Sequence, residues 1–161
     1  MRKKALENLT TVEEVLETVA EFDREAHSFY TDLIPKISKS IRYIVEELAR
    51  ARLDQVRMMS DLAKNPDVKS HFRDAIQRPA ADRQFSDAIH APDLGDNPDD
   101  QAVLQYALAR VQIAIEEYSE LAANTPPGLL HEVFSFLANE EVKHKSELEA
   151  LYYDIVHSGG V

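Results

Sequence analysis

Apolar residues recur at alternating steps of three and four along four separate stretches of the chain. This spacing places them on one face of an α-helix. Two stretches fall within residues 11–64 and two within residues 100–157. Each pair predicts a helical hairpin, and the apolar faces of the two hairpins predict one core between four helices.

Capping signals indicate where these helices begin and end. Thr11 and Glu14 form a capping box at the start of the first helix. Pro35 predicts a break between the first and second helices. Asn97-Pro98 and Thr125-Pro126 predict the starts of the third and fourth helices.

Residues 66–99 differ in character from the hairpins, because they are rich in proline and contain a Gly-Asp-Asn turn signal. Asn65-Pro66 predicts another helix start. Short helical pieces are expected over 68–76 and 82–89. We interpret the segment as a long crossover that covers part of the bundle with Phe72, Ile76, Phe85 and Ile89.

Polar residues interrupt the apolar faces of three helices. Asp23 lies in the first face, Arg52 and Gln55 in the second, and Glu141 and His144 in the fourth. Residues three apart share a face of a helix, so Glu141 and His144 point the same way. A carboxylate and an imidazole together on a buried face favour a metal site.

The two hairpins resemble each other in sequence. Arg52 and Gln55 align with Glu141 and His144, in segments that share the same helical pattern. Asp23 aligns with Val111, and Tyr30 with Tyr118 seven residues later in each helix. An internal repeat of this kind predicts pseudo-two-fold symmetry, which would bring these positions into one layer of the core.

The composition of the chain favours one helical domain and excludes several kinds of partner and metal site. The chain has 161 residues, 44 % of them hydrophobic, with only 4 Gly, which fits one helical domain over residues 1–161. A net charge of −11 argues against nucleic acid or an anionic membrane as partner. The absence of Cys excludes a cysteine-ligated iron site, and no apolar run is long enough to span a membrane. We therefore expect a cytoplasmic protein.

Three segments resemble the rubrerythrin-type branch of the ferritin-like superfamily: DREAHSFY, IEEYSELA and LANEEVKHKSEL. The resemblance covers about residues 12–64 and 100–156. It implies a ferritin-like four-helix bundle with a di-iron carboxylate site. It also implies a homodimer and an oxidoreductase that reduces peroxide or handles iron with electrons from a rubredoxin domain or a partner. Because the chain has no Cys, we expect no built-in rubredoxin domain, and the electron donor is unidentified.

The chain departs from the ligand set that this resemblance implies. Matching ligands are present at Asp23, Glu141 and His144. The other three positions hold Arg52 in place of a bridging Glu, Gln55 in place of a His, and Val111 in place of a Glu. The two-metal site is therefore degenerate.

Two interpretations follow, and the sequence leaves open whether the protein is an enzyme. In the first, the core is metal-free: Arg52 pairs with Asp23 and Glu141, and the protein is a binding or structural module. In the second, Asp23, Glu141 and His144 hold a single iron or manganese ion in an oxidoreductase. His27 is an additional ligand candidate, interpreted as a partly exposed flank residue.

Other polar and apolar groups receive simpler interpretations. Tyr30 and Tyr118 are expected in the core, with their hydroxyl groups bonded to buried carboxylates. The acids of the third helix are expected on a solvated face: Glu116, Glu117 and Glu120. The fourth helix has more apolar residues than one face needs, which indicates a second contact with the crossover or a partner subunit.

Overall fold

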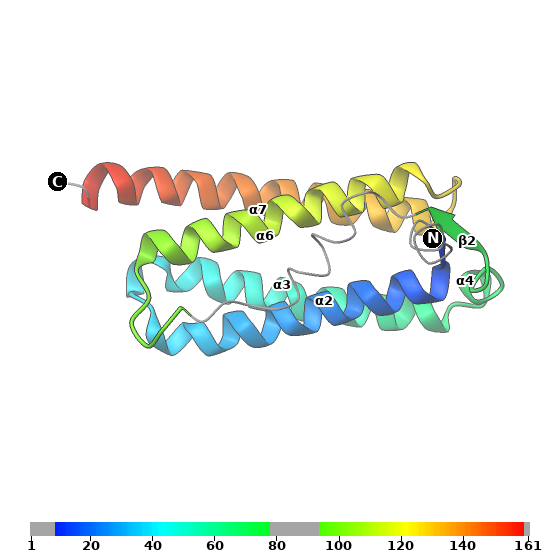
Figure 1. Ribbon diagram of the computed structural model, residues 1–161, viewed down its shortest axis with the longest axis horizontal. Coiled ribbons are helices and arrows are strands. Elements are labelled where there is room, and N and C mark those ends of the chain that lie inside the picture. Colours follow the sequence, from blue (N-terminus) through cyan, green and yellow to red (C-terminus); the bar gives the residue numbers. More distant parts are fainter. Residues whose placement is uncertain (1–8, 78–93, 160–161) are drawn as a thin grey trace, which may run out of the picture.

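The computed structural model describes residues 9–77 and 94–159. Four long helices lie side by side along the molecule (Figure 1): α2 (Val12–Leu33), α3 (Lys39–Lys64), α6 (Asp100–Ala123) and α7 (Leu129–Gly159). α2 packs along α3, and α6 packs along α7. The all-α prediction is confirmed, and the strands of the described part are limited to two short ones.

The start and the end of α2 follow the capping prediction. β1 (Leu9–Thr11) leads directly into the helix. The Thr11 hydroxyl accepts from the Glu14 backbone N–H at 3.2 Å, and the Glu14 carboxylate accepts from the Thr11 backbone N–H at 2.9 Å. Pro35 lies in a short 3-10 helix, η1 (Ile34–Lys36), which separates α2 from α3. The expected break is therefore present.

The first part of the crossover is less helical than its sequence predicted. Asn65 caps α4 (Pro66–Lys69), as expected, but a turn and then β2 (Ala75–Gln77) replace the predicted helical piece over 68–76. β2 pairs antiparallel with β1. Its backbone N–H and C=O groups therefore bond to a neighbouring strand and not to a helix of the crossover. The other predicted piece, over 82–89 with Phe85 and Ile89, lies outside the described residues.

Helices α6 and α7 both begin later than their capping signals predicted, although α6 begins at the predicted hairpin boundary, Asp100. Asp99 caps α6 by accepting from the Gln101 N–H at 3.1 Å, so Asn97-Pro98 lies before the cap. The Thr125 hydroxyl donates to the Leu121 carbonyl at 2.5 Å and thus belongs to the end of α6. A short turn follows Thr125-Pro126 before α7 begins, because two adjacent prolines favour an extended backbone at that point.

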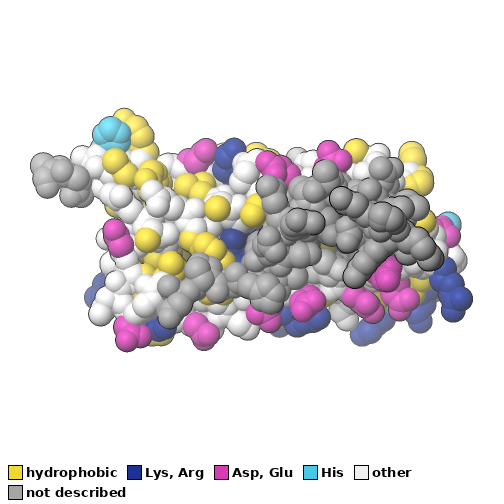
Figure 2. Space-filling model, viewed as in Figure 1, with side chains coloured by type: hydrophobic (Ala, Val, Ile, Leu, Met, Phe, Trp, Pro, Cys, Tyr) yellow, Lys and Arg dark blue, Asp and Glu magenta, His cyan; other side chains and the backbone are white. Residues whose placement is uncertain are grey.

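The C-terminal end of α7 extends past the other helices (Figure 1). The helix continues through Gly159. Hydrophobic side chains gather at this end of the molecule (Figure 2). Leu151 and Ile155 are only partly buried there, and Tyr153 is 62 % exposed. Among the described helices, none is both long and apolar enough to cross a membrane.

The hydrophobic core consists of two clusters. Phe22 and Tyr118 belong to the cluster near β1 and β2, and Ala26 and Val111 belong to the other. On α2, α3 and α7 the buried residues between the two clusters are all polar or charged: Asp23, Arg52, Gln55, Glu141 and His144. The core is therefore divided by a polar layer, which holds the candidate site.

Candidate functional site

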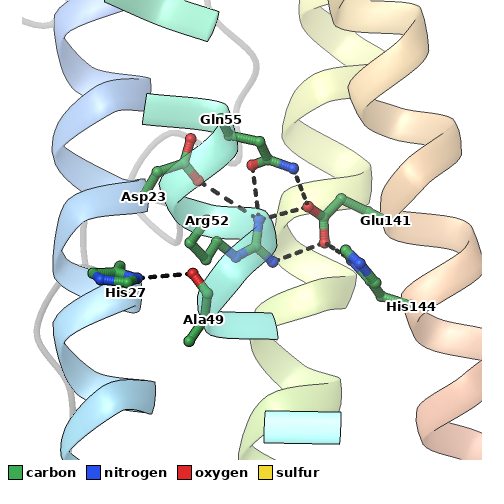
Figure 3. A network of polar contacts seen from close by, with 7 residues as sticks. All are labelled: Asp23, His27, Ala49, Arg52, Gln55, Glu141 and His144. Atoms are coloured by element: carbon green, nitrogen blue, oxygen red, sulfur yellow. Dashed lines mark hydrogen bonds and ion pairs between the residues drawn. The ribbon is translucent and has the colours of Figure 1, made fainter. Parts of the chain in front are cut away.

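The polar layer brings together the five residues that the sequence placed there (Figure 3): Asp23 of α2, Arg52 and Gln55 of α3, and Glu141 and His144 of α7. All are buried, and Asp23 and Glu141 have no exposed surface. The sixth predicted position, Val111 of α6, is also buried, in the adjoining hydrophobic cluster.

Arg52 and Glu141 form the centre of the layer. Arg52 Nη1 donates to Glu141 Oε2 at 2.5 Å, and Nη2 donates to Oε1 at 2.8 Å. Two parallel bonds between a guanidinium and a carboxylate form the strongest arrangement this pair can adopt. The predicted contact between Arg52 and Glu141 is confirmed.

Gln55 and His144 surround this pair. Gln55 accepts from Arg52 Nη1 at 3.0 Å through its side-chain oxygen, and its amide nitrogen donates to Glu141 Oε2 at 3.3 Å. His144 Nδ1 lies 3.5 Å from Glu141 Oε1. One carboxylate therefore has close polar contacts with three neighbouring side chains, and this accounts for its charged state in the core.

Arg52 lies beside Asp23, as predicted, but the two acids do not share the guanidinium equally. Its Oδ1 lies 3.6 Å from Arg52 Nη1, an ion-pair distance, and neither oxygen has a hydrogen-bond partner among the described residues. Burial raises the pKa of Asp23 to about 8, although the charges of Arg52 and Arg110 act in the opposite direction. Asp23 is therefore largely protonated at neutral pH.

Glu141 and Arg52 both remain charged. Burial by itself raises the pKa of Glu141, but Arg52 and, to a smaller degree, His144 lower it to about 2. Burial also lowers the pKa of Arg52, yet the adjacent Glu141 carboxylate leaves it above its usual value. The layer thus holds one complete ion pair beside a neutral acid.

These residues do not fit a divalent metal ion. Both Glu141 oxygens accept hydrogen bonds from a guanidinium, which also lies beside Asp23. Within the described ranges, no three His, Asp or Glu side chains are grouped so that they could hold a metal. His27 is partly exposed, as expected, and its Nδ1 donates to the Ala49 carbonyl at 2.8 Å, so that nitrogen is not free to bind metal.

Two buried charged residues of α6 were missed by the sequence analysis. Arg110 is 2 % exposed, and Glu117, which was expected on a solvated face, has no exposed surface. A second regular series in the sequence could have revealed them, because it repeats at steps of four and three: Val103, Ala107, Arg110, Ala114, Glu117 and Leu121. α6 buries this series next to the predicted one.

The two core tyrosines lie where they were expected, since Tyr30 and Tyr118 have no exposed surface. The Tyr30 hydroxyl, however, has no hydrogen-bond partner among the described residues, so the predicted bond to a carboxylate is absent there. Burial raises the pKa of Tyr30, against the lowering effect of Arg110 and Arg52. The phenol is therefore neutral and packs mainly as a core ring.

Comparison of the chain with protein-family models, with curated proteins and with solved structures found no match. The resemblance to rubrerythrin-type proteins therefore remains a prediction from the three sequence segments.

Proposed function

We propose that this protein is a ferritin-like helical bundle of rubrerythrin type, built from two repeated hairpins, in which the di-iron site has degenerated. Its core layer is metal-free, and the protein acts as a binding or structural module and not as an iron-dependent oxidoreductase. We also propose that the protein is cytoplasmic and forms a homodimer.

One observation carries the proposal. The Arg52 guanidinium donates to both oxygens of Glu141, which leaves that carboxylate's best acceptor positions occupied. A metal ion at this point would have to displace a buried cation and remove its charge partner, which is costly in a core. The neutral state of Asp23 removes a second anionic ligand at neutral pH.

The metal content of the purified protein tests the proposal. Protein produced in cells supplemented with iron and manganese should contain neither metal in stoichiometric amount. About two iron ions per chain, the content of an intact di-iron site, would contradict it. As a matched comparison, the triple variant Arg52→Glu, Gln55→His, Val111→Glu should regain metal if only those ligands were lost.

The alternative function is an oxidoreductase that uses a single metal held by Asp23, Glu141 and His144. Its support is limited to the position of His144 beside Glu141, at 3.5 Å. It predicts about one metal ion per chain in the wild-type protein, lost in His144→Ala, since one three-residue ligand set holds one ion. That result would replace the metal-free proposal.

A further inference from the structure

Arg110 is a buried cation that the proposed function does not explain. Its side chain is 2 % exposed, and Nη1 donates to the Tyr106 hydroxyl at 2.5 Å. Its Nε and Nη2 have no hydrogen-bond partner among the described residues. A buried guanidinium with one neutral hydrogen-bond partner needs other stabilisation.

Aromatic rings provide part of that stabilisation. The Arg110 guanidinium carbon lies 4.7 Å from the centre of the Phe22 ring and 5.6 Å from that of Tyr106. The Arg52 guanidinium carbon lies 5.8 Å from the same Phe22 ring. Both distances to Phe22 are within the range of cation–π attraction. Two arginines, one from α3 and one from α6, therefore contact one phenylalanine of α2.

This arrangement places Arg110 at the polar layer. Phe22 precedes Asp23 directly in the chain, and Arg110 precedes Val111. Arg110 is also close enough to act electrostatically on the Asp23 carboxyl group. The layer thus faces the positive charges of both arginines. Arg52 has a carboxylate partner, whereas no carboxylate of the described residues bonds to Arg110.

We propose that Arg110 is a second metal-excluding cation of the core, which acts on the same layer as Arg52. The inference rests on the metal-free core proposed above and extends it to a residue outside the six ligand positions. A divalent ion between Asp23 and Glu141 would be repelled by Arg110 even after Arg52 had been removed, because a charge in a protein interior is weakly screened.

Cobalt binding to variants with restored ligands tests this role. The parent is the triple variant Arg52→Glu, Gln55→His, Val111→Glu, which retains Arg110. Adding Arg110→Met, which keeps much of the side-chain volume, should lower the Kd for Co²⁺ by about tenfold or more, because one repulsive charge is removed. Calorimetry and the visible absorption of bound Co²⁺ give two independent readouts.

Adding Arg110→Lys to the same parent is the matched control. Lysine retains the charge, so its Kd should stay near that of the parent. An equal Kd with arginine and methionine, or no cobalt binding to either protein, would overturn the role of Arg110. If the methionine variant does not fold by circular dichroism, Arg110→Gln takes its place. Stoichiometric metal in the wild-type protein would instead contradict the proposed function.

Discussion

Glu141 keeps a negative charge in the middle of the core because Arg52 binds both of its oxygens. Asp23 lies beside the same guanidinium, at 3.6 Å, but has no hydrogen bond to it. Burial therefore determines the protonation state of Asp23, whereas the bidentate bond to Arg52 determines the protonation state of Glu141. Two acids on one layer thus have opposite protonation states at neutral pH.

Removing the guanidinium should destabilise the protein strongly. Arg52→Met leaves Glu141 as a buried carboxylate without its cation. Breaking a buried pair by removing one partner costs about 3–5 kcal/mol. The urea midpoint of unfolding, followed by circular dichroism, measures the loss.

The double variant Arg52→Met, Glu141→Leu is its control, since it removes both charges together. Most of the lost stability should return in it, because an apolar pair of similar volume can replace a buried ion pair. An unchanged midpoint in Arg52→Met alone would show that Arg52 does not neutralise this layer.

Asp23 should make stability depend on pH. The folded protein holds its proton up to about pH 8, whereas the unfolded chain releases it near 3.8. The folded state therefore binds more protons between these values, and stability falls as pH rises, by up to about 1.4 kcal/mol per pH unit. The side chain of asparagine does not ionise, so the Asp23→Asn variant should lack this pH-dependent part of the stability.

The difference in unfolding free energy between wild type and Asp23→Asn isolates the effect, since all other groups titrate in both proteins. The wild type should lose stability relative to the variant from about pH 4 to about pH 8, with little change outside this window. A difference that does not vary with pH would show that Asp23 is ionised in the folded state.

At the scale of the elements, α6 differs from the helix that the sequence predicted. It buries two adjacent faces, one predicted from its apolar spacing and one that includes Arg110 and Glu117. α2 and α3 each bury a single face and follow their predicted pattern closely. Arg110 and Glu117 were missed because only one apolar face was assigned to this helix, so charged positions outside that face were counted as solvent-facing.

The start of α2 depends on its capping box. Thr11→Ala removes the hydroxyl that accepts from Glu14 N–H and should cost about 0.5–2 kcal/mol. Thr11→Ser retains the hydroxyl and serves as the control. Thermal unfolding followed by circular dichroism compares the two. Equal stability of alanine and serine variants would show that the strand pairing of β1, and not the cap, secures this end.

At the scale of the whole molecule, the projecting end of α7 is the surface we expect a second copy to cover. Hydrophobic side chains gather at this end of the molecule (Figure 2), and Tyr153 is 62 % exposed. Exposed apolar surface of this kind is typical of interaction sites. We therefore expect a homodimer in sedimentation velocity experiments.

Two tyrosine substitutions separate this surface from the rest of the molecule. Tyr153→Glu should shift the protein toward the monomer, because it places a charge in the proposed contact. Tyr43→Glu, on α3, alters a tyrosine that is 56 % exposed and should leave the dimer intact. A monomeric wild-type protein, or a dimer insensitive to Tyr153→Glu, would contradict this interface.

The sequence by itself determined the four long helices and the positions that form the polar layer, because apolar periodicity and capping are local properties of the chain. Arg52 could be matched to Glu141 from the internal repeat and from the need to pair buried charges. The tertiary structure alone decided that both guanidinium bonds go to Glu141 and that Asp23 becomes neutral. It also decided that Arg110 is buried. These outcomes depend on distances and burial between helices far apart in the chain, which no local pattern contains.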